Sequence, residues 1–129
     1  MGISVRISLA SPEADLTAAI RPGVSTILAP RVESAAQIRA VDTVIRDLER
    51  RHGIRPDTVK LHALIESPKG ISMASEIASS APRLRAMGVG PNLSVSLENG
   101  DALAYAAAEC ELHALASGLT PLNMHYVLD

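Results

Sequence analysis

The fold class of this 129-residue chain is decided by residues 24–65, VSTILAPRVESAAQIRAVDTVIRDLERRHGIRPDTVKLHALI. The two ends of this stretch, 24–29 and 59–65, are short apolar runs that predict β-strands. Between them, Ser34 is a good N-cap for a helix whose apolar residues recur every three or four positions. A strand, a helix and a second strand in this order predict parallel strands joined by a right-handed crossover.

The same alternation continues in both directions from this unit. Residues 3–9 alternate polar and apolar side chains as a strand does, and Ser11-Pro12 is typical of the start of a helix. We predict strands at 3–9, 24–29, 59–65, 84–89 and 122–128, and helices at 12–20, 35–52, 70–80 and 100–116. The order βαβαβαβαβ is typical of an α/β fold with a parallel sheet.

Composition and charge exclude several classes of protein. Hydrophobic residues make up 47% and charged residues 20%, as in a folded globular domain. The net charge is −2 and aromatic residues make up 2%, so the chain has neither the basic field nor the stacking side chains of a nucleic-acid-binding protein. The N-terminal segment lacks the pattern of a signal peptide, and no apolar run is long enough to span a membrane. We therefore expect a soluble cytoplasmic protein without a nucleic-acid or membrane partner.

Several polar groups are expected to be structural. One face of the 35–52 helix carries charged residues that we interpret as solvated, namely Arg39, Asp42, Arg46, Asp47, Glu49, Arg50 and Arg51. The histidines have no metal-binding spacing and are also expected to be structural, namely His52, His62, His113 and His125. Cys110 is the one cysteine, and its glutamate neighbours are expected to raise the pKa of its thiol, so it is not a candidate nucleophile.

Two architectures use this alternation, the open doubly wound sheet and the eight-stranded (β/α) barrel. A barrel needs about 250 residues, so the length favours the open sheet. However, no glycine-rich phosphate loop follows any predicted strand, so the nucleotide-binding form of the open sheet has no motif here. In both architectures ligands bind at the carboxyl ends of the strands. Polar residues lie within or just after four predicted strands, namely Arg6, Glu33, Glu66 and Asn92.

Four segments of the sequence also carry a family resemblance. They are VRISL at 5–9, LAPRVESAAQIRAVD at 28–42, LHALIESPKGISMASEIASSAPRL at 61–84 and GPNLSVSL at 90–97, followed by the tail ASGLTPLNMHYVLD at 116–129. In this order they resemble the citrate lyase beta-subunit family, within the wider HpcH/HpaI group of aldolases and CoA-ester lyases. The resemblance implies a (β/α)8 TIM barrel truncated to about five βα units, which match strands three to seven of the barrel. Residues 1–129 would then form one partial barrel domain.

The resemblance also implies roles for residues at the carboxyl ends of the strands. Arg6 matches the family arginine that grips a substrate carboxylate or carbonyl, and a planar guanidinium suits that role. Glu66 matches the metal-binding glutamate, and a carboxylate is a hard ligand suited to Mg²⁺. Asn92 stands where the family has the second metal-binding carboxylate, so the Mg²⁺ site is expected to be weaker than in the family.

Two further positions match the family less directly. Glu33 matches an acidic position of the family motif, with Arg31 in place of the usual lysine. We expect Glu33 either to be catalytic together with Arg6 or to belong to a salt-bridge network at the start of the helix. Lys69 keeps the basic character after Glu66, and it either meets a phosphate of coenzyme A, as a second substrate-binding residue, or is solvated.

The activity implied by the resemblance is Mg²⁺-dependent carbon–carbon cleavage or condensation of a hydroxyacyl-CoA thioester through a metal-stabilised enolate. Two alternatives stay open. In the first, the chain is a non-catalytic part of a barrel that associates with a second copy or a partner chain, because unpaired strands at both edges favour association. In the second, it is a class II aldolase that uses pyruvate and a divalent metal, with a 2-oxo or hydroxy acid as its small-molecule partner.

Overall fold

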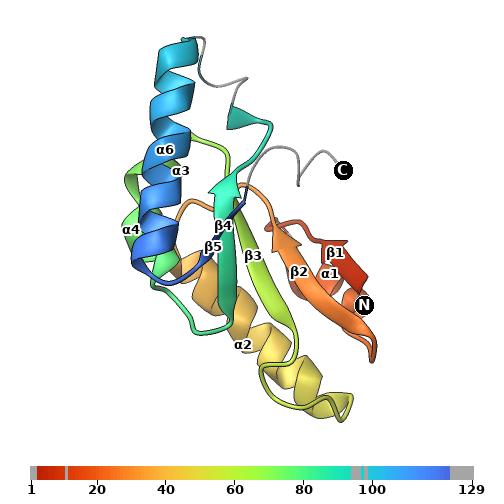
Figure 1. Ribbon diagram of the computed structural model, residues 1–129. Coiled ribbons are helices and arrows are strands. Elements are labelled where there is room, and N and C mark those ends of the chain that lie inside the picture. The colour runs from red at the N-terminus through yellow and green to blue at the C-terminus, as the bar shows by residue number, and fades with distance from the viewer. Residues whose placement is uncertain (1–2, 11, 94–96, 98, 123–129) are drawn as a thin grey trace.

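Five parallel strands form the sheet of this protein, in the spatial order β1-β2-β3-β4-β5 (Figure 1). The structure is a computed structural model and describes residues 3–10, 12–93, 97 and 99–122. The strands are β1 (Ile3–Arg6), β2 (Val24–Ala29), β3 (Lys60–Ile65), β4 (Leu84–Val89) and β5 (Thr120–Leu122). The helices are α1 (Pro12–Ala19), α2 (Ala35–Arg51), α3 (Pro68–Ser72), α4 (Ala74–Ala78) and α6 (Gly100–Ala116). The predicted α/β fold with a parallel sheet is confirmed.

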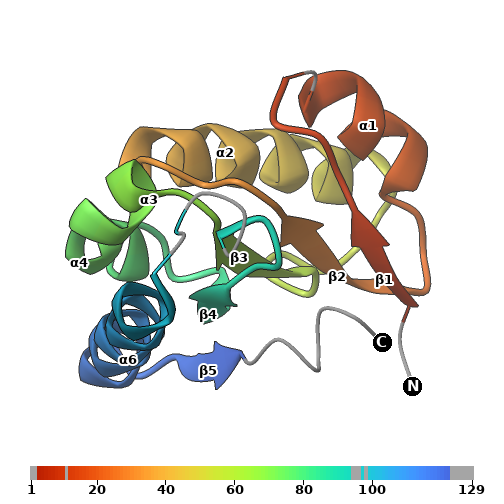
Figure 2. The ribbon, with the colours of Figure 1, turned by 90° about the horizontal axis from the view of Figure 1, so that it is seen from above.

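The helices all lie on one side of the sheet. Figure 2 shows the sheet curving, with these helices on its convex side and no helix of the described residues on its concave side. The convex side is packed with buried aliphatic side chains, among them Ile27, Leu61 and Met87. None of the described helices combines the length and the apolar character needed to cross a membrane. A doubly wound sheet carries helices on both faces, so this one-sided arrangement is closer to the wall of a barrel.

Helix α2 begins where the sequence predicts and ends one residue earlier, at Arg51. The Ser34 hydroxyl accepts a hydrogen bond from the Gln37 N–H at 3.2 Å, and the Gln37 side chain accepts one from the Ser34 N–H at 3.1 Å, which is a capping box. After the helix, Gly53 has a φ of 65°, a left-handed conformation that glycine adopts without strain. The cap and the glycine explain why the helix begins and ends where it does.

The interpretation of the charged face of α2 as wholly solvated is wrong for two residues. Asp42 and Glu49 are 7% and 1% exposed. Both accept hydrogen bonds from the buried Arg83, with Nε to Asp42 Oδ1 at 2.6 Å and Nη2 to Glu49 Oε1 at 2.9 Å. Arg83 Nη1 also donates to the Val59 carbonyl at 2.8 Å. A guanidinium is costly to bury unless carboxylates pair with it, so these two carboxylates turn inward.

The predicted helix at 70–80 is two short helices, α3 and α4. The first begins earlier than predicted, because the Ser67 hydroxyl caps it by accepting a hydrogen bond from the Gly70 N–H at 3.0 Å. It ends at Ser72, and the N–H of the next residue, Met73, donates to the carbonyl of Gly70, three residues back, at 3.1 Å. This tight closing turn separates α3 from α4.

The two edge strands also differ from the prediction. β1 ends at Arg6 and not at residue 9, because the chain turns away where the Ser8 N–H donates to the Asp15 side chain at 2.7 Å. β5 is formed by Thr120–Leu122. The rest of the strand predicted at 122–128 lies outside the described residues.

Cys110 on α6 is fully buried. Its burial raises the pKa of the thiol to about 12. The predicted direction of the shift is therefore confirmed, but its cause is removal from water and not the neighbouring glutamates.

Candidate functional site

The centre of the candidate site is the Glu66 carboxylate, which directly follows β3. Its side chain is 1% exposed. Oε1 accepts a hydrogen bond from the Arg31 N–H at 3.1 Å, and Oε2 accepts one from the Asn92 N–H at 3.1 Å. Arg31 follows β2 and Asn92 follows β4, so one carboxylate joins the loops after three neighbouring strands.

Gly90 makes room for this carboxylate. A Cβ atom at position 90 would lie 2.5 Å from Cδ of Glu66, which is too close for any side chain. The Gly90 N–H donates to the carbonyl of Ile65 at 2.9 Å, so the loop after β4 lies directly against the end of β3. The visible signal of this requirement in the sequence is the pair Gly90-Pro91 directly before the candidate ligand Asn92.

Arg6 approaches the Glu66 carboxylate from β1. Its Nη2 lies 3.9 Å from Glu66 Oε1, and its side chain is 46% exposed. This distance is at the outer limit of an ion pair, so the guanidinium keeps donors for another anionic group. Arg6 and Glu66 therefore place an accessible cation beside a buried anion.

Arg31 contacts Glu66 through its backbone and not through its side chain. Its φ of 55° is left-handed, a conformation that is unfavourable for a residue with a side chain. In this conformation its N–H reaches Glu66 Oε1. The sequence indicates only a side-chain charge at this position, whereas the observed contact of Arg31 with Glu66 is made by the main chain.

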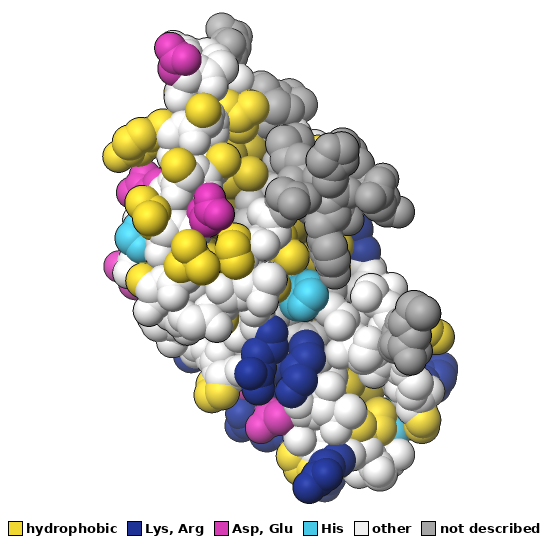
Figure 3. All heavy atoms as spheres, in the orientation of Figure 1, with side chains coloured by type: hydrophobic (Ala, Val, Ile, Leu, Met, Phe, Trp, Pro, Cys, Tyr) yellow, Lys and Arg dark blue, Asp and Glu magenta, His cyan; other side chains and the backbone are white. Residues whose placement is uncertain are grey.

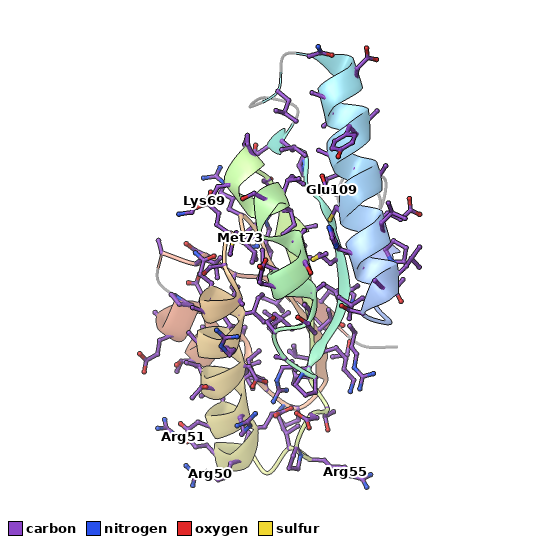
Figure 4. The ribbon with its side chains drawn as sticks, turned by 90° about the vertical axis from the view of Figure 1, so that its left-hand side faces the viewer. Arg50, Arg51, Arg55, Lys69, Met73 and Glu109 are labelled. Atoms are coloured by element: carbon purple, nitrogen blue, oxygen red, sulfur yellow. The ribbon has the colours of Figure 1, made fainter. Side chains whose placement is uncertain are left out.

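Glu33 and Lys69 are not in direct contact with this pair in the hydrogen bonds and ion pairs of the described residues. Glu33 Oε2 accepts a hydrogen bond from the Ser67 hydroxyl at 2.7 Å, which links the start of α2 to the start of α3. Lys69 is exposed, and Figure 4 shows its side chain pointing outward from α3, away from the strands. Ser67 therefore connects Glu33 to the loop that carries Glu66, while Lys69 lies apart from it.

The residues present offer oxygen ligands for one hard cation, but only one carboxylate. Among the described residues, no group of three or more His, Cys, Asp or Glu side chains is arranged to hold a metal ion. Glu66 brings one negative charge, and Asn92, whose side chain is a neutral amide, contacts Glu66 through its main-chain N–H. Each carboxylate oxygen has two acceptor positions, so the N–H bonds to Glu66 are compatible with a cation. This donor set fits Mg²⁺, which proteins usually bind through one or two carboxylates. With one carboxylate in place of two, the expected affinity for Mg²⁺ is low.

The histidines lie away from this arrangement or outside the described residues. His62 is in the middle of β3, in register with Leu28 of β2, and burial lowers its pKa, so it is neutral at pH 7. His113 on α6 lies 3.8 Å from Glu109, one turn away on the same helix. His125 lies outside the described residues. The described histidines therefore contribute nothing to the candidate metal site.

Comparison of the sequence with known proteins finds similarity to two lyases. Over 76 residues the chain is 36% identical to citrate lyase subunit beta of Haemophilus influenzae, a match that covers 59% of this chain and 26% of that protein. Over 64 residues it is 42% identical to L-malyl-CoA/beta-methylmalyl-CoA lyase of Cereibacter sphaeroides, covering 50% of this chain and 20% of that protein. The matched regions thus span about a quarter of these relatives or less.

Two solved structures show the likeness in fold. RipC from Yersinia pestis superimposes with a TM-score of 0.74 at 18% identity, covering 93% of this chain and 56% of that one. CitE from Mycobacterium tuberculosis, solved with magnesium and acetoacetate, superimposes with a TM-score of 0.71 at 24% identity, covering 94% of this chain and 50% of that one. This chain therefore spans about half the length of both solved proteins.

A family model extends the match to almost the whole chain. The model of the HpcH/HpaI aldolase/citrate lyase family matches residues 3–124. This range includes all five strands of the sheet and each of the residues placed in the candidate site. The chain belongs to the HpcH/HpaI aldolase/citrate lyase family.

Proposed function

We propose that this chain forms part of the active site of a carbon–carbon lyase, and that its substrate is the CoA thioester of a hydroxy acid. One observation carries the proposal: the half-exposed Arg6 guanidinium lies 3.9 Å from the buried Glu66 carboxylate, at the carboxyl end of the sheet. Ligands bind at this end of parallel sheets. The two relatives named above, a citrate lyase subunit and a malyl-CoA lyase, support the class of reaction.

Arg6 is the proposed catalytic residue that binds substrate. Its planar guanidinium would grip the carboxylate or carbonyl oxygen of the substrate through two parallel hydrogen bonds. Glu66 would hold Arg6 in place through its charge. Glu33 is proposed to act in catalysis through Ser67, which joins it to the loop of Glu66. Lys69 is proposed to contact the CoA part of the substrate outside the reaction centre, because it is exposed on α3.

Glu66 and Asn92 are the proposed Mg²⁺ ligands. When bound there, the ion supplies Lewis-acid polarisation of a substrate oxygen. An amide in place of a second carboxylate lowers the charge that faces the ion, so we propose weak Mg²⁺ binding that substrate strengthens.

We also propose that residues 1–129 form one partial barrel domain of about five βα units. The curved sheet with helices only on its convex side supports this reading. Its two edge strands, β1 and β5, each lack a neighbour on one side among the described residues. Open edges of this kind favour association. Association with a second copy or a partner chain, with or without activity, is therefore part of the proposal.

Calorimetric titration with acetyl-CoA and with pyruvate, each in the presence of Mg²⁺, tests the substrate class. Binding of acetyl-CoA, weakened about tenfold by Arg6→Met, supports the CoA-ester lyase. Binding of pyruvate alone supports the class II aldolase. Arg21→Met is the matched control, because Arg21 is an exposed arginine in the turn before β2. If Arg6→Met and Arg21→Met bind both compounds as the wild type does, the assignment of Arg6 is wrong.

A further inference from the structure

The outward side of α6 is apolar. Three of its large side chains are strongly exposed, with Tyr105 at 70%, Leu112 at 66% and Leu115 at 56%. Figure 3 shows hydrophobic side chains gathered along this helix. The opposite side of α6 is already buried in the core through Ala106, Cys110 and Ala114. A helix that is apolar on both sides is typical of a helix that is covered on both sides.

The exposed apolar residues follow the spacing of a helix–helix contact. Tyr105, Ala108, Leu112 and Leu115 succeed one another at intervals of three, four and three residues, and we name these four residues the α6 seam. This spacing brings them onto one stripe along the helix, as at the contact positions of a coiled coil. An amphipathic helix that docks on such a stripe presents its own apolar residues at the same intervals.

A groove runs beside the α6 seam. It has a volume of about 540 Å³ and lies between α6 and the strands β4 and β5. Its lining includes Leu103 and Ala107 of α6, together with Val89 and Leu122 of the strands. Ala108 belongs to both the seam and the groove lining, so the apolar surface is continuous from one to the other.

Two carboxylates flank the seam. Glu111 lines the groove on one side. Glu109 lies on the other side of the stripe, next to His113 (Figure 4). Glu109 and Glu111 occupy the positions that flank the apolar residues of a coiled coil. Charged residues at these positions determine which helix is bound. Two copies of α6 packed against each other would bring four carboxylates together, which disfavours a second copy as the occupant.

We propose that the α6 seam and groove dock an amphipathic helix of a different protein chain, with aliphatic residues facing the seam and Lys or Arg flanking them. Charge complementarity to Glu109 and Glu111 selects this occupant over a second copy. The surface lies on the convex side of the sheet and shares no residue with the Arg6–Glu66 pair, so this inference stands independently of the proposed activity.

Fluorescence anisotropy with two synthetic helical peptides tests this inference. Both carry leucines at the contact positions, and they differ only in having Lys or Glu at the flanking positions. We expect the Lys peptide to bind the full chain about tenfold more tightly than the Glu peptide at low salt, with the difference shrinking as salt is raised. Leu112→Gln should weaken binding of the Lys peptide about tenfold. Because Leu112 is exposed, the variant should still fold.

Charge reversal supplies the matched control. In the double variant Glu109→Lys and Glu111→Lys, the preference should switch to the Glu peptide, whereas Glu76→Lys on α4 should leave it unchanged. The inference is overturned if neither peptide responds to Leu112→Gln. It is also overturned if sedimentation shows that the wild-type chain dimerises and that Leu112→Gln dissociates the dimer, because the occupant would then be a second copy.

Discussion

Helices α2 and α6 have 17 residues each and pack on the same side of the sheet, yet their outer faces are opposite in character. The outer face of α2 is charged, with Asp47 paired to both Arg50 and Arg51. Figure 4 shows these two arginines pointing outward at the free end of α2. The outer face of α6 carries Tyr105, Leu112 and Leu115.

The difference indicates which of the two outer faces is suited to water and which is suited to contact with another protein surface. The outer face of α2 carries exposed ion pairs, as an ordinary solvated protein surface does. The outer leucines of α6 would gain free energy by leaving water, and on this ground we infer that the outer face of α6 is a contact surface. In both helices the decisive residues are those that break the usual pattern: buried carboxylates in α2 and exposed leucines in α6.

The largest expected effect is loss of the buried arginine that anchors α2. Arg83→Ala leaves Glu49 as a buried carboxylate without its cation and leaves Asp42 with Arg46 as its ion-pair partner, which should lower the free energy of unfolding by about 3–5 kcal/mol. Urea unfolding followed by circular dichroism measures it. Arg85→Ala is the control, because Arg85 is an exposed arginine of β4, two residues after Arg83, and its loss should change stability by less than about 0.5 kcal/mol. If both substitutions lowered the free energy of unfolding equally, the buried ion pairs of Arg83 would not be a specific source of stability.

The second prediction compares the effect of the same substitution, leucine to glutamine, in the two helices. Leu48 of α2 is 4% exposed, so Leu48→Gln should lower the free energy of unfolding by about 2–5 kcal/mol. Leu112→Gln on α6 should change it by less than about 0.5 kcal/mol, because Leu112 is 66% exposed in the isolated chain. Thermal unfolding of both variants checks this. A large loss in the α6 variant would mean that its outer face is already covered.

A third prediction concerns the glycine beside Glu66. Gly90→Ala forces a Cβ atom against the Glu66 carboxylate and should destabilise the chain by about 1–3 kcal/mol. It should also weaken any ligand that depends on that carboxylate. Gly100→Ala is the control, because a Cβ atom there meets nothing within 4 Å. If both alanine variants unfold at the same urea concentration, Glu66 does not sit against the loop after β4.

A fourth, smaller effect is the dependence of stability on pH. Burial alone raises the pKa of Glu49, but the hydrogen bonds and charge of Arg83, with the N–H groups of Val59 and Asp57, outweigh burial and lower it below the ordinary 4.5. The ionised Glu49 therefore contributes stability above about pH 4.5, and this contribution is lost as the pH falls through the lowered pKa.

Glu49→Gln tests this contribution directly. The variant should be less stable at pH 7, and its free energy of unfolding should fall less than that of the wild type between pH 7 and about pH 3. Urea unfolding at a series of pH values gives both curves. Glu76→Gln, an exposed glutamate on α4, should keep the slope of the wild type. Parallel curves for Glu49→Gln and the wild type would contradict the lowered pKa.

The fold could be predicted from the sequence wherever a local signal was present. Ser34 and Gly53 mark the two ends of α2, and the range 100–116 is the helix that the pattern indicates. The partners of Arg83 could not be predicted, because Asp42 and Glu49 have the same spacing as their solvated neighbours. Only the packing of α2 against the start of β4, far away in sequence, separates buried from solvated carboxylates.

The candidate site was predictable to a similar degree. Parallel strands place their carboxyl ends at one edge, so Arg6, Glu66 and Asn92 could be expected to lie together. The outward direction of Lys69 depends on how α3 is turned about its axis, which a five-residue helix does not reveal by periodicity. The left-handed Arg31 and the close approach at Gly90 are backbone features, and residue types alone do not report them.

The central claim is that Glu66 and Asn92 form a weak cation site, and Mg²⁺ titration calorimetry on the full chain tests it most directly. Asn92→Asp restores a second carboxylate and should tighten Mg²⁺ binding about tenfold, whereas Glu66→Gln should abolish it. Asn99→Asp adds the same charge at the N-cap of α6, where the side chain accepts hydrogen bonds from the N–H groups of Asp101 and Ala102, and should leave the affinity unchanged. Equal Mg²⁺ affinities for the wild type, Asn92→Asp and Glu66→Gln would contradict the account.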